Sequence, residues 1–413
     1  MRFPELTPIR QRLPAPAEVD VAVEVAARVD ALAGCVRPGM HIAITAGSRG
    51  IAQYPVLLAA LVARLKGIGA VPFLVPAMGS HGGASAEGQV EVLESLGITE
   101  SSVGCTIVSS LEVIHLGETA EGVPVWVDRA AAEADGIIVV NRVKPHTDFV
   151  GEVESGLLKM MAVGLGKCAG AASVHSHGLH LGMARVVPAV GQVVLSHCRI
   201  LFGLAVLEDA HHRVARVVGV EPAQMEQTER QLLREAQALT PGLPCGELDV
   251  LVVDEMGKEI SGTGLDTKVI GRIRISGTCE PLAPRIRRIV VRDLTAASRG
   301  NALGVGLADV VTRKLADKID QAAMYENAIA SSCPEQAYLP VVAATDREAI
   351  QFALSMIGAV PPEQARLMRT HNTRDLEYLS VSTALLPELG GRCDIEVLGQ
   401  TQPLSFDATG RLL

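Results

Sequence analysis

Apolar and polar positions along the first half of the chain follow two different periods. Short apolar runs with the length of buried strands occupy residues 41–45, 71–76 and 136–141. Stretches with apolar residues at helical spacing occupy residues 19–33, 55–66 and 85–97. Glycine-rich turns separate the first two strands from the helices that follow them. This alternation predicts a doubly wound, mostly parallel α/β sheet.

A Pro/Gly-rich segment, residues 240–246, interrupts this pattern and predicts a linker. Beyond it the pattern predicts strands at 248–253, 288–291 and 339–343, helices near 307–319 and 347–356, and a short helix at 361–369. We therefore expect two α/β domains, residues 1–243 and 248–413, with the active site in the cleft between them. Residues 394–413 are too polar and too interrupted by glycine for their structure to be predicted.

Polar side chains follow each apolar run of the first domain. Ser48 and Arg49 follow the first run, His81 follows the second, and Lys144 and His146 follow the third. In a doubly wound sheet, ligands bind outside the carboxyl ends of the strands. We therefore expect these five side chains to reach one crevice.

Three of these side chains have an ordinary interpretation beside the functional one. Arg49 is placed to grip a carboxylate through two parallel hydrogen bonds, or it forms a surface ion pair. His81, in Gly-Ser-His-Gly-Gly, is open to a ligand that approaches small residues, or it is a solvated loop histidine. His146 follows Pro145, which restricts the backbone and so directs the imidazole toward a ligand. In the alternative interpretation, the His146 imidazole only hydrogen-bonds a neighbouring carbonyl.

An apolar run at 157–163 contains one charged residue, Lys159, and His175, His177 and His180 follow it. Burial of an ammonium group lowers the lysine pKa and makes the amine reactive. The alternative is a lysine whose stem lies along the apolar surface while its amine reaches water. Three histidines within six positions can bind a borderline metal, although no cysteine or carboxylate stands at ligand spacing to them.

Composition narrows the class of ligand. The 413 residues suffice for two cores, and 48% hydrophobic with 3% aromatic residues suits apolar central strands. A net charge of −9 without a basic run argues against nucleic acid, so we expect a small-molecule partner.

No leader-like or membrane-spanning apolar stretch is present, which favours a cytoplasmic protein without a membrane partner. The eight cysteines are dispersed and form no C-x-x-C pair, so they predict neither a zinc knuckle nor a disulfide framework. A homo-oligomer is compatible with the sequence.

The run Ser155-Gly-Leu-Leu-Lys159, with a histidine sixteen residues later, resembles the nickel-pincer lactate racemases. The resemblance implies that Lys159 carries a covalently attached nickel-pincer nucleotide, pyridinium-3,5-bisthiocarboxylic acid mononucleotide with nickel. It also implies that His175 completes the nickel coordination. Leu157 and Leu158 stand where the family pattern has glycine and arginine. Lys167 lies in the same run but only eight residues before His175, so the spacing selects Lys159 as the anchor.

The same resemblance implies roles for residues at the strand ends. His81 and His146 would be the catalytic acid/base pair, and Arg49 would hold the substrate carboxylate. Ala46 replaces an aspartate that touches the cofactor in the family. Ser48 and the backbone of Gly79, Gly82 and Gly83 are candidates for holding the cofactor phosphate.

The second domain of the family also donates a lysine to the substrate carboxylate. The glycine-dense loop 256–268 offers Lys258 or Lys268, and we select Lys268; an ordinary irregular loop is the alternative interpretation.

The implied activity is racemisation or epimerisation of a lactate-like α-hydroxyacid by hydride removal and return, with the cofactor-synthesis enzymes as partners. One alternative is a divergent member of the family that binds an anionic nucleotide or hydroxyacid without turnover. Another is a metal-dependent lyase or hydratase that uses His175, His177 and His180.

Overall fold

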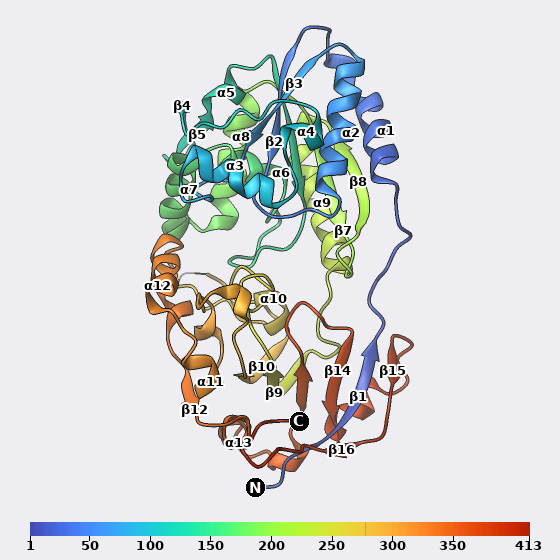
Figure 1. Ribbon diagram of the computed structural model, residues 1–413, viewed down its shortest axis with the longest axis vertical. Coiled ribbons are helices and arrows are strands. Elements are labelled where there is room, and N and C mark those ends of the chain that lie inside the picture. Colours follow the sequence, from blue (N-terminus) through green and yellow to red (C-terminus); the bar gives the residue numbers. More distant parts are fainter. Residues whose placement is uncertain (277) are drawn as a thin grey trace. The chain divides into compact units, whose positions relative to one another are not determined.

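The computed structural model describes residues 1–276 and 278–413 and divides into two compact units (Figure 1). One unit comprises residues 14–240, and the other comprises residues 1–13 together with 241–413. The division falls at the start of the Pro/Gly-rich segment. We expected residues 1–243 to form one domain, but residues 1–13 belong to the unit of residues 241–413. The reason is that strand β1 (Glu5–Gln11) pairs with β14 (Tyr378–Ser382).

A five-stranded sheet forms the centre of the 14–240 unit. Its order is β3 (Val71–Pro76), β2 (His41–Ala46), β6 (Gly136–Arg142), β7 (Ile200–Glu208) and β8 (Val214–Val220). The first four strands are parallel and β8 is antiparallel to β7. The three apolar runs of the first domain are therefore strands of a mostly parallel sheet, as predicted.

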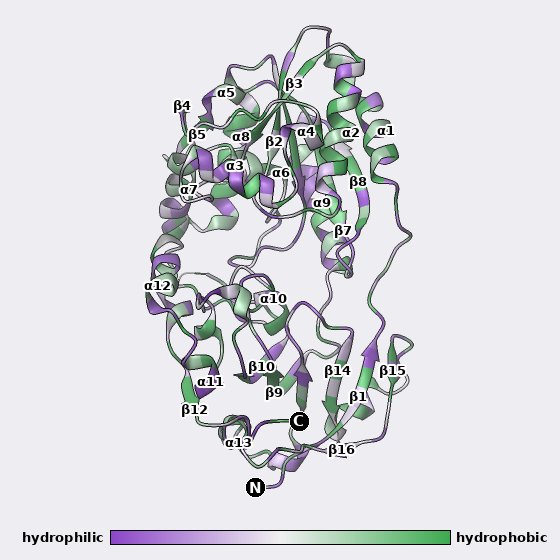
Figure 2. Ribbon diagram, viewed as in Figure 1, coloured by the Kyte–Doolittle hydropathy of each residue, from purple (hydrophilic) through white to green (hydrophobic). Residues whose placement is uncertain are grey.

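Alternate residues of the central strands face two separate cores. Ile42 and Ile44 of β2 join a core with α1 and α2, whereas Ala43 joins a core with α8 and α9. Both faces of the sheet are covered, so the central parts of its strands are mostly apolar (Figure 2). The helices and the small hairpin of this unit are α1 (Val21–Leu32), α2 (Tyr54–Gly67), α3 (Ala86–Ser95), α4 (Glu100–Val103), β4 (Val113–Glu118), β5 (Pro124–Asp128), α5 (Arg129–Ala132), α8 (Met183–His197) and α9 (Met225–Leu239).

Capping side chains start the first helices near their predicted positions. Asp20 accepts hydrogen bonds from the amides of Ala22 and Val23 at the start of α1. Ser85 accepts a bond from the Gly88 amide at 3.0 Å, which confirms it as the cap of α3. Each cap satisfies amides that have no partner inside the helix.

The apolar run around Lys159 folds into a sharply bent helical segment. A single turn, α6 (Leu157–Lys159), leads into a π-helical turn (Met160–Gly164) and then into α7 (Lys167–Leu181). The two helical parts meet at 107°. No single helix in the described residues has the length and apolarity to span a membrane, although this bent pair meets both criteria.

A nine-stranded sheet forms the centre of the other unit. Strands β12 (Val341–Ala343), β11 (Val310–Thr312), β10 (Arg285–Val291), β9 (Glu247–Val253) and β13 (Leu367–Thr370) lie parallel to their neighbours. Strands β14, β1 and β15 (Ile395–Val397) continue the sheet antiparallel, and β16 (Gln402–Pro403) also pairs with β1. The helices of this unit are α10 (Thr267–Ile270), α11 (Arg313–Ala316), α12 (Gln321–Ala330), α13 (Asp346–Ser355) and α14 (Leu386–Leu389).

Two predicted helices of this unit are wrong. Residues 307–319 contain strand β11 and a single helical turn, because the β-branched Val310 and Val311 are fully buried beside β10. Residues 361–369 begin with a short 3-10 turn and enter strand β13, because Leu367 and Met368 are buried beside β9. The helix predicted at 347–356 is confirmed as α13.

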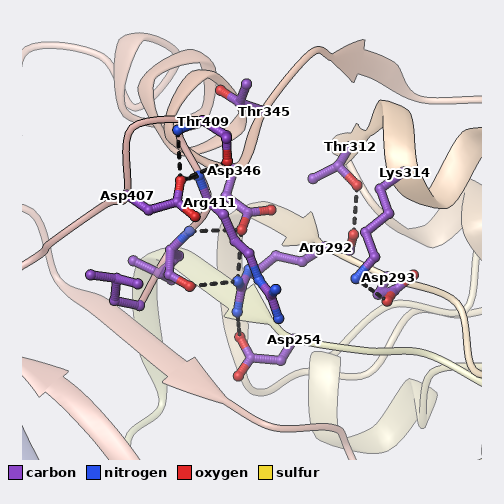
Figure 3. Close-up of polar contacts among 12 residues, drawn as sticks. Asp254, Arg292, Asp293, Thr312, Lys314, Thr345, Asp346, Asp407, Thr409 and Arg411 are labelled. Atoms are coloured by element: carbon purple, nitrogen blue, oxygen red, sulfur yellow. Dashed lines mark hydrogen bonds and ion pairs between the residues drawn. The ribbon is translucent and has the colours of Figure 1, made fainter.

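Ion pairs fill the carboxyl edge of the parallel strands in this sheet (Figure 3). Arg292 follows β10 and lies 2.6 Å from both Asp254 and Asp346. The Leu412 amide donates to Asp346 at 2.9 Å, and Arg292 donates to the Leu412 carbonyl at 3.1 Å. Because Arg292 pairs with both carboxylates, we interpret this edge as a structural network.

Candidate active site

Three neighbouring parallel strands deliver polar side chains to one edge of the sheet in the 14–240 unit. Strands β2, β3 and β6 end at Ala46, Pro76 and Arg142, and Ala46 is paired with Pro76. The loops that follow carry the predicted residues Ser48, Arg49, His81, Lys144 and His146. Ser48 Oγ lies 2.5 Å from His81 Nδ1 and joins the first two loops directly.

The amine of Lys159 is hydrogen-bonded to the imidazole of His146 through Nζ and Nε2. On the opposite side of the ring, the Asp148 amide donates to His146 Nδ1 at 3.0 Å. A neutral imidazole carries one N–H, so a ring that accepts at Nδ1 carries its proton on Nε2. In that tautomer the imidazole donates to the Lys159 nitrogen when the amine is neutral. The contact is therefore compatible with the neutral, nucleophilic form of the lysine.

The surroundings of Lys159 favour the same state. Its pKa is lowered from 10.5 to about 8, chiefly by burial and also by the charges of Lys144 and Arg49, while Asp148 opposes the shift. The sequence-based expectation of a lowered lysine pKa is thus confirmed.

His175 lies within electrostatic range of the same amine. Burial lowers the pKa of His175, Lys159 adds to the effect, and Asp148 opposes it. The bend between α6 and α7 explains how residues sixteen positions apart on a helical segment influence each other. Lys159, His146 and His175 therefore form one group of bases.

Two carboxylates that sequence reasoning missed organise the loop that carries His146. Glu154 is 1% exposed and accepts hydrogen bonds from the amides of His146 at 2.5 Å and Gly151 at 3.1 Å. Asp148 interacts electrostatically with Lys159, as described above. The ring of Phe149 lies against the imidazole, with 4.6 Å between the ring centroids. This loop has no apolar period, so no sequence signal could have identified Asp148 or Glu154.

Lys167, the other lysine of the apolar run, is a structural cation. It is 0% exposed, and its amine lies 2.5 Å from the Pro76 carbonyl and 3.1 Å from both Gln89 Oε1 and Asp128 Oδ2. The contacts with Pro76 and Gln89 are hydrogen bonds, and the contact with Asp128 is an ion pair. This amine is therefore fully engaged inside the protein.

A second buried carboxyl, Glu229 of α9, lies beneath the turn that carries Lys159. It is 1% exposed and accepts a hydrogen bond from the Leu158 amide at 2.9 Å. Burial raises its pKa to about 7, although the Leu158 and Leu157 amides favour the charged form. A sequence signal existed for Glu229, because it interrupts the apolar stripe of α9 formed by Met225, Leu232, Leu233 and Ala236.

The raised pKa of Glu229 predicts a pH-dependent stability. The carboxyl has a pKa of about 7 in the folded protein and about 4.5 in the unfolded chain, so the folded state binds its proton more tightly. The stability that this proton contributes is therefore lost as pH rises from about 4.5 to about 7. Glu229→Gln cannot ionise, and we expect its stability relative to wild type to increase by roughly 1–3 kcal/mol between about pH 4.5 and about pH 8. Urea unfolding at both pH values measures this. A stability difference that is independent of pH would contradict it.

The two leucines before Lys159 pack into the core and do not face the group of bases. Leu157 and Leu158 are 0% exposed. A Cβ at Gly203 would lie 2.6 Å from Leu157, and one at Gly191 would lie 2.9 Å from Leu158. Glycines on β7 and α8 thus make room for both side chains. The leucines that stand in place of the glycine and arginine of the family pattern therefore serve to pack the core.

The predicted phosphate-binding glycines differ in their surroundings. The Gly79 amide already donates to the Gly164 carbonyl at 3.2 Å. Gly82 has a φ of 70°, and a Cβ there would lie 2.6 Å from the backbone of Gly88 at the start of α3. Gly83 has a φ of 62° and no atom within 4 Å of a Cβ. Of the three glycines, only Gly83 has open space where its side chain would be.

The three histidines do not form a metal cluster. Residues 1–276 and 278–413 contain no group of three or more His, Cys, Asp or Glu side chains that could hold a metal ion. On α7 the positions of His175, His177 and His180 do not share one helix face, and His177 Nδ1 lies 2.8 Å from the Ser173 carbonyl. The structure therefore does not bring the three histidines together into one metal site.

The candidate lysines of the other unit lie around the glycine-dense loop. Lys258 Nζ donates to the Gly262 carbonyl at 2.5 Å and to Asn327 Oδ1 at 3.0 Å. Lys268 lies on α10, where its amide donates to Asp266 Oδ1 at 2.9 Å. Its role toward substrate stays a prediction.

Comparison with known proteins agrees with the resemblance seen in the sequence. Residues 5–182 match the family model of the lactate racemase N-terminal domain. The lactate racemase apoprotein from Thermoanaerobacterium thermosaccharolyticum is similar in fold, with a TM-score of 0.52 and 11% identity over 84% of this chain and 91% of that one. A Thermotoga maritima crystal structure matches with a TM-score of 0.49 and 14% identity, over 67% of this chain and 72% of that one. No curated protein sequence matches the chain.

Proposed function

We propose that this chain, whose residues 5–182 match the lactate racemase N-terminal domain, interconverts the stereoisomers of an aliphatic α-hydroxyacid. The proposal includes a nickel-pincer nucleotide attached to Lys159. One observation carries it: the buried Lys159 amine, whose pKa is lowered to about 8, is hydrogen-bonded to His146 and lies within electrostatic range of His175.

The residues around Lys159 fit such a group. Formation of an amide-type bond to a thiocarboxylic acid needs an unprotonated amine, and Lys159 provides one. Metal binding needs a neutral imidazole, and the lowered pKa of His175 keeps its ring neutral. Ser48 and the backbone at Gly83 are the candidates for the nucleotide phosphate. When bound, the cofactor supplies an acceptor for the hydride of the hydroxyl-bearing carbon.

The chain itself would bind the acid and move the hydroxyl proton. Arg49 would hold the carboxylate through two parallel hydrogen bonds. His146 Nε2 is occupied by the Lys159 amine, but an acylated nitrogen is a poor acceptor, so attachment would release Nε2 toward substrate. His81, oriented through Nδ1 by Ser48, would serve the opposite face.

The test is production of the protein together with the cofactor-synthesis enzymes, followed by nickel analysis and chiral chromatography of a panel of hydroxyacids. We expect bound nickel and interconversion of at least one acid. Protein without nickel and without turnover would overturn the proposal. Tight binding of a hydroxyacid by that inactive protein would favour a binding protein instead, a possibility that the alanine at position 46 keeps open.

Replacement of the carboxylate-binding arginine should weaken substrate use. Lys cannot make the two parallel bonds of a guanidinium, so we expect Arg49→Lys to lower kcat/KM about 10- to 100-fold, chiefly through KM. Steady-state racemisation kinetics measure the effect. Arg216→Lys, at an exposed arginine paired with Glu235 at 2.6 Å, is the matched control. Equal kinetics in both variants would remove Arg49 from the site.

A further inference from the structure

The peptide groups directly before Lys159 are held from two sides. Asn141, near the end of β6, donates through Nδ2 to the Gly156 carbonyl at 2.7 Å. Glu229, from α9, accepts the amide of Leu158 at 2.9 Å. Turn α6 has no capping side chain of its own, so its buried amides need a partner from elsewhere. Glu229 supplies that partner from a helix more than sixty residues away in sequence.

The fit between Glu229 and this turn leaves no space for a side chain at position 156. A Cβ on Gly156 would lie 2.3 Å from Glu229 Oε1 and 2.5 Å from its carboxyl carbon. The φ of Gly156 is 179°, an extended conformation that any residue adopts. Glycine is therefore required here for the close approach of the carboxyl group and not for its backbone freedom.

We propose that Glu229 is a positioning residue of the site, which fixes the turn before Lys159 so that the Lys159 amine meets His146 Nε2. Leu158 is the residue next to the lysine, so a displaced Leu158 amide moves the Lys159 Cα and swings the amine away from the imidazole. Asn141 holds the other end of the same short segment. The inference extends the proposed function, since it says how the attachment lysine is kept reactive, but it concerns the cofactor-free protein and can be tested without nickel.

The test is competitive acetylation of the full chain with trace acetic anhydride over a range of pH, with each lysine quantified by peptide mass spectrometry. Wild-type Lys159 should be half-reactive near pH 8, and exposed Lys66 is the internal reference. In Glu229→Ala the acceptor is missing, and we expect the reactivity of Lys159 near pH 8 to fall about tenfold or more relative to Lys66. Gly156→Ala pushes the carboxyl aside without altering it and should have the same effect.

Two further variants separate positioning from a general loss of stability. Glu229→Gln keeps an oxygen that can accept the Leu158 amide, so its Lys159 profile should stay within about twofold of wild type. Leu232→Ala removes a buried side chain from the same helix, and it should lower the melting temperature without moving the profile. The proposal is overturned if Lys159 reacts normally in both Glu229→Ala and Gly156→Ala. It also fails if Leu232→Ala shifts the profile equally, or if Glu229→Gln behaves like Glu229→Ala.

Discussion

Wild-type protein produced with the cofactor-synthesis enzymes should carry a covalent mass increment on Lys159, and Lys159→Ala should carry none. The physical reason is the state of the two amines in this run. The Lys159 amine contacts His146 and has a pKa lowered to about 8, whereas the Lys167 amine lies against three buried oxygen atoms, two of them hydrogen-bonded to it and the third, of Asp128, in an ion pair with it. Intact-protein and peptide mass spectrometry measure the increment and its position.

The control must remove Lys167 without leaving a buried charge behind. Lys167→Met combined with Asp128→Asn does this, because an asparagine oxygen can still accept the Ala131 amide, as Asp128 does at 2.9 Å. We expect this double variant to retain the full increment. Loss of the increment there, with retention in Lys159→Ala, would move the anchor to Lys167 and remove the spacing argument for His175.

The second large effect concerns stability. Lys167→Met alone should lower the free energy of unfolding by about 3–5 kcal/mol, because it strands the carboxylate of Asp128 in a fully buried position. It also leaves the Pro76 carbonyl and Gln89 Oε1 without their donor. Urea unfolding at constant pH measures the loss.

Neutralising the partner should restore much of that stability. In Lys167→Met/Asp128→Asn no charge remains in the buried pair, so we expect the double variant to be more stable than Lys167→Met alone. If adding Asp128→Asn lowers the stability further, the two side chains do not act as a pair.

The central strands of the 14–240 unit could be predicted because both of their faces are buried. Ile42 and Ala43 point to opposite cores, so three consecutive apolar residues, 42–44, mark the centre of β2 in the sequence. The same reason explains the failure at residues 307–319. Strand β11 is only three residues long, and Val310 and Val311 also fit a helical period.

The site could be predicted where topology places it and not where tertiary contacts create it. Ser48 and His81 follow neighbouring parallel strands, so the sequence was enough to expect them at one edge, and they are in contact. Glu229 reaches Leu158 only through the packing of α9, and Lys167 becomes a structural cation only because Asp128 of the β5 hairpin meets it. The interrupted apolar stripe of α9 marks Glu229 as unusual, but the local sequence does not show which residue either side chain contacts.

The pairing of β1 has a consequence for the order of folding. Among the described strands β1 is synthesised before all others, whereas its neighbours β14, β15 and β16 come after all others, so the pairing of Leu6 with Ser382 cannot form until β14 has been made. Residues 14–240 can complete their own sheet meanwhile, whereas β15 and β16 have only β1 to pair with. A fragment of residues 241–413 would therefore expose the edge of β14 and be prone to aggregation, and a separate peptide of residues 1–13 should restore its solubility in trans.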